Sequence, residues 1–331
     1  MLPWQGYVNI VPAFSVDILL CSLHSLIRYC PFIMMQPTGS LGTAITKALH
    51  ASGLFEVTML LRSAPKDLLP GVKFALVDYS DTSSLQRSLV GQDAVVSALP
   101  REMVLAQILL IDLAITAGVQ RFIPSEFGAN LQNEKSRHLP NYHSKVQVEE
   151  YLESKAALGQ ISYTYIYTNA LLDWSIRAGI VLDFRKQSVS LYDGGENPVS
   201  MTTIPTAANA VTSVLLKPLE TKNRAVYVHD IIMSQKELFT YAKEVSGSQI
   251  WKEEVVDLVE LAEAARKENP VATTANPNMT LFHAGAMSGG FAQGYGNRFG
   301  ESDIELLAIE PLHKGDLKTL LRELYEESRG T

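Results

Sequence analysis

Two glycines at the start of an expected helix indicate the binding of a phosphorylated ligand. They lie in Thr38-Gly39-Ser40-Leu41-Gly42, between an apolar run and a segment with helical spacing of apolar residues. The free N–H groups and the positive dipole end of such a helix bind a diphosphate. Gly39 would let the backbone approach the phosphate, and Gly42 would let the helix pack against a sheet. The pair alone is a weak signal, because short glycine pairs open helices in many proteins.

Arg62 strengthens this interpretation. It follows the β-rich run Phe55–Leu61, at the strand end where a ribose 2′-phosphate would arrive. A cation there favours NADP, whereas an acidic residue would favour NAD. The alternative is a solvated charge at a strand end. We therefore expect NADP to be held by Thr38, Gly39, Leu41, Gly42 and Arg62.

The residues before the turn depart from the full dinucleotide fingerprint. A further glycine is expected three residues before Gly39, and Gln36 stands there. Pro31 lacks an N–H and suits an edge or the first residue of a strand, although the first strand of such a fold is central. Pro37 fixes φ beside the turn. Either the dinucleotide binds to an altered turn, or residues 1–36 are not the segment with which the fold evolved.

The elements that must position these residues alternate between short apolar runs and longer helical segments. The expected strands are Phe55–Leu61, Val72–Val77, Ala94–Leu99, Val119–Pro124 and Tyr163–Tyr167. The expected helices are Thr43–Ser52, Ser83–Leu89, Val104–Ala117 and Ser144–Ala157. Because strands separated by helices form parallel βαβ units, we expect an α/β fold with a Rossmann-like, doubly wound parallel sheet.

From about residue 170 the pattern changes, and we expect a smaller C-terminal α/β substrate lobe. The expected elements are a turn at Tyr192–Gly195, a strand at Arg224–Val228, helices at Ser234–Val245 and Val255–Lys267, and a loop at Asn269–Asn278. Gly285–Gly300 holds six glycines with aromatic residues, which suggests a mobile loop or lid. The expected division is an atypical extension at 1–30, an NAD(P)-binding domain at 31–170, and a substrate-binding lobe at 171–331 that interleaves with the sheet edge.

The composition excludes several other classes of protein. The 331 residues are 47% hydrophobic and 19% charged, which supports a packed core and rules out wholesale disorder. A net charge of −7 makes nucleic acid or a membrane surface an unexpected partner. The apolar run Ile18–Ile27 follows no basic residue and is shorter than a membrane span of about 20 residues. The two cysteines, Cys21 and Cys30, cannot form a disulfide framework, and we expect both to be reduced in a cytoplasmic protein. We also expect a monomer or a homodimer.

Metal and hydrolase chemistry have no support in the sequence. The seven histidines show no metal-ligand spacing, and His138 and His143 have no acidic or cysteine partner nearby in the sequence. A Gly-x-Ser-x-Gly elbow is absent. We therefore expect no metal site.

The chain resembles the NmrA-like branch of the short-chain dehydrogenase/reductase superfamily over about residues 37–330. More narrowly, it is similar to the isoflavone reductases and phenylcoumaran benzylic ether reductases, in their fungal form. The resemblance is carried by the glycine turn, Arg62, Val77–Tyr79, Gly91–Ser97, Ala117–Gly128, Leu139–Lys145, Asp173-Trp174 and Tyr192–Gly195. Arg121–Gly128 is the most specific run. The family usually begins almost at its first strand, so the extra residues here suggest an altered or mis-joined N-terminal segment.

The resemblance implies NADPH-dependent reduction of a small, often aromatic or polyketide-type secondary metabolite. Lys145 matches the family's catalytic lysine, whose ammonium hydrogen-bonds the nicotinamide ribose and positions or relays a proton. Ser125, Glu126 and Phe127 would face the nicotinamide, and Ser97 and Leu99 would line the adenosine and pyrophosphate side. Asn169 would contact the cofactor or the substrate.

Several alternatives to these roles stay open. Without the motif, Lys145 would be interpreted as a surface lysine on a helix. Phe127 fits a core residue as well, and Trp174 fits a core residue or a pocket wall equally well. Tyr142 and His143 are weaker proton-relay candidates, and we take the spacing of Tyr151 and Lys155 as coincidental, since such pairs arise freely in helices. Two functions remain as alternatives to the reductase. One is a regulator that binds NADP without turnover, and the other is a relative in which Pro31 and Gln36 abolish cofactor binding.

Overall fold

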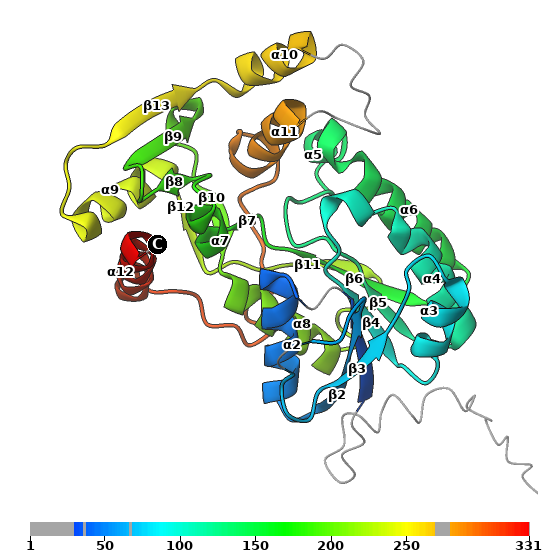
Figure 1. Cartoon of the computed structure of the whole chain (residues 1–331). Coiled ribbons are helices and arrows are strands. Elements are labelled where there is room, and N and C mark those ends of the chain that lie inside the picture. Colours follow the sequence, from blue (N-terminus) through cyan, green and yellow to red (C-terminus); the bar gives the residue numbers. More distant parts are fainter. Residues whose placement is uncertain (1–29, 36–37, 66–67, 269–278, 331) are drawn as a thin grey trace, which may run out of the picture.

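The computed structural model describes residues 30–35, 38–65, 68–268 and 279–330. In this part of the chain, seven strands form one parallel sheet in the order β11-β6-β5-β4-β1-β2-β3 (Figure 1). The strands are β1 (Cys30–Met35), β2 (Phe55–Leu61), β3 (Lys73–Leu76), β4 (Ala94–Ser97), β5 (Arg121–Ile123), β6 (Ser162–Tyr167) and β11 (Arg224–Tyr227). The order reverses between β1 and β4, so the predicted doubly wound, Rossmann-like fold is confirmed.

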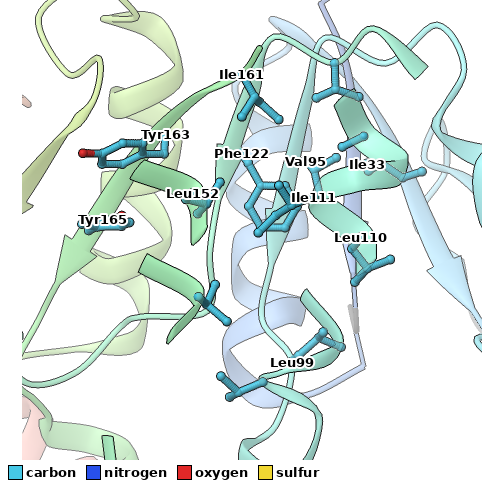
Figure 2. Close-up of a cluster of buried hydrophobic side chains, with 14 of the residues drawn as sticks. Ile33, Val95, Leu99, Leu110, Ile111, Phe122, Leu152, Ile161, Tyr163 and Tyr165 are labelled. Atoms are coloured by element: carbon cyan, nitrogen blue, oxygen red, sulfur yellow. The ribbon is translucent and has the colours of Figure 1, made fainter. Parts of the chain in front are cut away.

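Helices cover both faces of this sheet. One face carries α2 (Ser40–Ala51) and α8 (Ile204–Leu216). The other carries α3 (Thr82–Leu89), α4 (Ala106–Ala117) and α6 (His143–Ala157). Figure 2 shows the second core, where residues of α4 and α6 meet Val95 and Phe122 from the strands.

The apolar runs of the sequence explain why the strands are buried on both faces. Val95 faces α3, α4 and α6, and its neighbour Val96 faces α2 and α8. Phe122 and Ile123 divide in the same way, because successive side chains of a strand point to opposite faces. All four side chains have no exposed surface, and each contributes about 1.5–3 kcal/mol by its burial.

The remaining described elements form a smaller lobe with two three-stranded sheets, ordered β12-β10-β7 and β13-β9-β8. Its strands are β7 (Ala170–Leu171), β8 (Leu182–Asp183), β9 (Ser188–Tyr192), β10 (Val199–Thr202), β12 (Ile231–Met233) and β13 (Lys252–Val256). Its helices are α7 (Leu172–Arg177), α9 (Gln235–Ser246), α10 (Leu258–Glu268), α11 (Met279–Phe291) and α12 (Lys314–Gly330). The short α5 (Glu134–Arg137) lies between β5 and α6. The chain returns from the lobe to the main sheet through α8 and β11, so the two units interleave.

The prediction of a mobile loop or lid at Gly285–Gly300 is wrong for its first part, because α11 runs to Phe291. Two of its glycines face a 3₁₀ turn at Pro140–Tyr142. A Cβ at Gly285 would lie 2.0 Å from Oδ1 of Asn141, and one at Gly289 would lie 2.9 Å from the Tyr142 ring. These glycines therefore permit close packing of a helix.

Two further expectations differ from the structure. The helix expected from Val255 begins at Leu258, because the preceding residues pair with β9 as strand β13. Pro31 lies in a central strand after all, since β4 pairs with β1 only from Phe32 onward and Pro31 is opposite Glu56 of β2 alone. Gln36, Pro37, the N-terminal extension up to residue 29 and the loop at 269–278 lie outside the described residues.

Candidate active site

The predicted site residues follow the carboxyl ends of parallel strands and therefore share one edge of the sheet. Thr38 and Gly39 follow β1, Arg62 follows β2, Ser97 and Leu99 end or follow β4, Ser125 to Phe127 follow β5, Asn169 follows β6, and Lys145 lies on α6. In doubly wound folds, ligands bind at this edge, where the strand order reverses. Here the reversal lies between β1 and β4.

The N-terminus of α2 is open to an anion. Gly39 is the N-cap, with φ −75° and ψ 163°, and neither a capping side chain nor an acidic residue of the first turn occupies the helix end. A Cβ at Gly39 would meet no described atom within 4 Å. Gly42 is buried within α2, and its carbonyl accepts a hydrogen bond from Thr46 at 2.8 Å. Among the described residues, the N-terminus of α2 thus has no side-chain cap, which leaves its first-turn amides as candidate donors to a diphosphate.

Arg62 lies beside this helix end, in a cavity of about 50 Å³. The cavity is lined by Thr38, Leu60, Leu61, Arg62, Tyr79, Leu99 and Met103. The Arg62 side chain is exposed, and within the described ranges it makes no ion pair. A free guanidinium next to an open helix N-terminus fits a ligand that carries a further phosphate.

Ser125 ties together the ends of β4 and β5. Its hydroxyl donates to the Leu99 carbonyl at 2.9 Å, and its N–H donates to Oε1 of the buried Gln107 at 2.9 Å. Ser97 is fully buried, and its Oγ has no hydrogen-bond partner in the part of the chain described. The Ser125 hydroxyl is thus used by the protein, whereas that of Ser97 is buried without a described partner and lines neither cavity described here.

Lys145 and Glu126 form a buried pair next to these strand ends. The Lys145 Nζ donates a hydrogen bond to the Glu126 backbone carbonyl and lies 3.6 Å from Oε2 of the same residue. The side chain of Glu126 is 1% exposed, and its oxygens accept no hydrogen bond from any residue the structure describes. Burial raises the pKa of Glu126, against the opposing effects of Lys145 and Arg137.

A second cavity, of about 170 Å³, opens beside this pair. Its lining is mostly apolar and comprises Phe127, Gly128, Ala129, Tyr142, Asn169, Ala170, Leu171, Trp174, Ser175, Ile180, Ala286, Met287, Gly290 and Phe291. A Cβ at Gly128 would be 3.9 Å from the Lys145 Nζ, which places the ammonium next to a residue of the cavity lining. Trp174 lines this cavity and is 45% exposed, so it belongs to the pocket wall and not to the core.

Tyr142 brings a proton donor into the apolar cavity. Burial raises the pKa of Tyr142 to about 12, so its hydroxyl stays protonated near neutral pH. Its neighbour His143, the other weak relay candidate, begins α6 and does not line the cavity. The structure therefore separates the two candidates by position.

Two residues at the cavity have left-handed backbone angles, which side chains adopt at a cost. Phe127 has φ 37° and Asn169 has φ 49°. Phe127 packs into the core beneath α2 and α8 and also forms part of the cavity wall. The Asn169 amide donates to the Ser200 carbonyl at 2.8 Å and the Gly290 carbonyl at 3.1 Å. Its buried Oδ1 has no described partner and is left for a ligand.

The structure also shows what sequence reasoning missed. Ile180, Met287 and Phe291 supply cavity wall from the smaller lobe and were not singled out as site residues in the sequence. Gln107 is the one amide side chain in the apolar helix α4, a pattern that could have marked its role. Tyr151 and Lys155 instead contact Asp112 of α4, at 2.6 and 3.2 Å.

Metal ligation and membrane insertion find no support in the described residues. They contain no group of three or more histidine, cysteine or acidic side chains that could hold a metal ion. None of their helices is both long and apolar enough to cross a membrane. Among the described residues, the uncapped end of α2, the unpaired Arg62 guanidinium and the unpartnered Oδ1 of Asn169 fit a phosphorylated dinucleotide.

Comparisons with known proteins agree with this geometry. The model of the NmrA-like family matches residues 32–264. The oxidoreductase aprR of Aspergillus flavus is 32% identical over 232 residues, which cover 69% of this chain and 77% of that protein.

Solved structures share the fold. The complex of leucoanthocyanidin reductase from Vitis vinifera with NADPH has a TM-score of 0.68 and 18% identity, and the match covers 89% of this chain and 99% of that one. The structure of AtPrR2 with NADP+ and (+)-pinoresinol has a TM-score of 0.70 and 20% identity, covering 90% and 99%.

Proposed function

The chain belongs to the NmrA-like family, and from this premise we propose that it is an NADPH-dependent reductase of a small apolar molecule. The resemblance found in the sequence is thereby confirmed at the level of the family. The proposal is supported by relatives named as oxidoreductases and by structural neighbours that are reductases with NADPH or NADP+ bound.

The observation that carries the proposal is the proximity of two different surfaces. The first joins the open end of α2 to Arg62 and suits a phosphorylated dinucleotide. The second is the apolar cavity that extends from Phe127 to α11. Lys145 stands next to the lining of this cavity, so a proton donor and a hydride donor would reach one substrate from neighbouring positions.

The coenzyme, when bound, supplies hydride, and the chain's own residues supply the rest. The amides at Gly39 and the guanidinium of Arg62 bind the phosphates. Lys145 holds a proton on Nζ beside the substrate cavity, and the neutral Tyr142 hydroxyl is a second donor in the same cavity. The apolar lining excludes water from the reacting atoms.

The cavity also supports a class of substrate. Its aromatic wall, with Phe127, Tyr142, Trp174 and Phe291, favours a flat aromatic or polyketide-type secondary metabolite. The reduced bond is a C=C, a C=O or a benzylic ether C–O bond. The expectations of a cytoplasmic location and of a monomer or homodimer stay predictions.

A turnover panel tests the proposal. The folded protein is mixed with NADPH and a series of aromatic ketones, enones and benzylic ethers, including (+)-pinoresinol, and coenzyme oxidation is followed by absorbance. Oxidation that depends on one of these compounds supports the reductase. Tight NADPH binding without any oxidation favours a regulator that senses NADP, and no binding indicates a cofactor-deficient relative.

A further inference from the structure

Five charged side chains near the sheet edge form two groups of ion pairs, one around Arg137 and one at Lys145. Arg137 of α5 contacts two acids of α6: its Nη1 lies 3.0 Å from Oε2 of Glu149, and its Nη2 lies 3.0 Å from Oε1 of Glu150. Lys145 contacts Glu126, with 3.6 Å between Nζ and Oε2. Lys145 and Glu149 are one helical turn apart on α6, so they lie on the same face.

The acids in these groups outnumber the cations. Three carboxyl groups, those of Glu126, Glu149 and Glu150, share the charges of Lys145 and Arg137. Glu150 is solvated, with 61% of its side chain exposed, but Glu126 and Glu149 are shielded from water. A buried carboxylate that lacks full compensation takes up a proton instead of staying charged.

The surrounding groups add no further positive charge. The Tyr167 hydroxyl donates to Oε1 of Glu149 at 2.5 Å and accepts from Gln132 at 3.2 Å. The Tyr165 hydroxyl donates to the Glu149 carbonyl at 3.0 Å and lies 3.4 Å from the acid Glu153. Tyr142 also faces Glu126, and all three tyrosines are neutral at physiological pH because burial raises their pKa values.

The pKa values of the two buried acids are raised, as expected when their negative charges are not fully compensated. Burial and the charge of Glu126 raise the pKa of Glu149 to about 8. Burial raises the pKa of Glu126 as well, against the effects of Lys145 and Arg137. Two coupled acids of this kind titrate as a pair, so the first proton belongs to both.

We propose that Glu126 and Glu149 share one proton at neutral pH and that this proton reloads Lys145 during turnover. The second half of this statement rests on the proposed reductase function. When Lys145 gives a proton to the reduced substrate, one N–H bond breaks. The O–H bond of Glu126 then breaks and a new N–H bond forms on Lys145, which leaves an ammonium–carboxylate pair. A proton from solvent restores the store after the product leaves, so Glu126 and Glu149 act through Lys145 as positioning residues.

Infrared spectroscopy of the protein alone tests the shared proton. With ¹³C-labelled glutamate, the carbonyl stretch of a protonated glutamic acid is separated from that of aspartic acid. The wild type is expected to show this band at pH 7 and to lose it as the pH rises beyond about 8. Glu126→Gln and Glu149→Gln should each remove at least about half of the band at pH 7, because either change relieves the repulsion that keeps the proton bound.

Glu150→Gln is the matched control, because Glu150 binds the same arginine from an exposed position, and it should leave the band in place. Thermal melts establish that each variant is folded, and the two buried positions provide independent variants. The absence of the band from the wild type overturns the proposal. So does a band lost in only one of the two variants, which would place the proton on a single residue.

Lys145→Met tests the link to the lysine. Loss of the ammonium removes the charge that favours ionised Glu126, so the band should persist to higher pH by about one unit or more. An unchanged titration would overturn the reloading step. Because none of these spectra requires coenzyme, a failure of NADPH binding would contradict the proposed function without affecting this result.

Discussion

At the scale of single residues, the contacts of the Lys145 ammonium with Glu126 define its place in the proposed reaction. The ammonium is held by the Glu126 carbonyl and lies close to the carboxylate of the same residue, next to the lining of an apolar cavity. The family resemblance placed Lys145 at the nicotinamide ribose and Glu126 at the sheet edge that faces the nicotinamide, but it did not predict the contact between them. The sequence could not show that the Glu126 carboxyl is buried without a hydrogen bond, since that depends on the packing of α5, α6 and β6.

Replacement of this lysine tests its role directly. Lys145→Ala should lower the rate of NADPH oxidation by about 10²–10⁴-fold, the range for loss of a positioned proton donor. NADPH affinity should stay nearly unchanged, because the phosphate contacts lie at Gly39 and Arg62. Steady-state kinetics with the substrate found in the panel, together with fluorescence titration of NADPH, measure both. A fully active variant would show that Lys145 takes no part in the reaction.

The buried Glu149 predicts a dependence of stability on pH. Its pKa is raised in the folded state to about 8 from an ordinary value of 4.5. The folded state therefore binds more protons than the unfolded state between these values, and stability falls as the pH rises through this window. Below 4.5 the contribution is fully present, and above about 8 it is lost. In melts from pH 5 to 8, the melting temperature of Glu149→Gln should fall less than that of the wild type; parallel curves would refute the assignment.

At the scale of elements, six of the seven strands of the main sheet were predictable, whereas β1 and α11 were not. Ala94–Leu99 is a nearly continuous apolar run, the pattern of a strand covered on both faces, and Phe55–Leu61 is rich in residues that favour strands. Six glycines between 285 and 300 indicated a loop, because glycine disfavours helices. Gly285 and Gly289 allow α11 to pack closely against Asn141 and Tyr142, which lie more than 100 residues earlier in the chain. The local sequence pattern cannot show such a long-range contact.

Strand β13 was missed for a related reason. Its residues Lys252, Glu253 and Glu254 are exposed at the edge of a three-stranded sheet. Charged residues are common on edge strands, where they discourage pairing with other chains, but they hide the alternation that marks a strand. Its partner β9 lies some 60 residues earlier in the sequence, so only the fold reveals the pairing.

The packing of α11 gives a prediction for stability. In a helix interior, a change from glycine to alanine ordinarily stabilises by about 0.5–1 kcal/mol. Gly285→Ala should instead destabilise, by about 1–3 kcal/mol, because the new Cβ would lie 2.0 Å from Asn141 Oδ1. Gly290→Ala is the control on the same helix, since no described atom lies within 4 Å of its Cβ. Denaturant unfolding of both variants measures the difference, and equal stability would mean that the close contact is absent.

At the scale of the whole molecule, function depends on where two units meet. The main sheet contributes Phe127, Asn169 and the Lys145–Glu126 pair, and the smaller lobe contributes Trp174, Ile180 and α11. The sequence predicted the sheet edge and a second lobe. It could not predict the cavity between them, because the cavity shape comes from contacts between residues far apart in the chain.

The interleaved topology also bears on the N-terminal segment. Cys30–Met35 forms a central strand between β2 and β4, so this part of the chain before the glycine turn belongs to the sheet. The hypothesis of an altered or mis-joined segment stays a prediction. Sequencing the transcript across residues 25–45 tests it, and a transcript that encodes the segment as written would reject mis-joining.

Calorimetric titration of the coenzymes tests the central claim most directly. The wild type should bind NADPH at least about tenfold more tightly than NADH, because Arg62 adds a charged contact to the 2′-phosphate. Arg62→Ala should weaken NADPH binding by about 10–100-fold and leave NADH nearly unchanged, and Arg322→Ala, on the exposed face of α12, should alter neither. No heat with either coenzyme, or an equal loss of both in Arg62→Ala, would contradict the account.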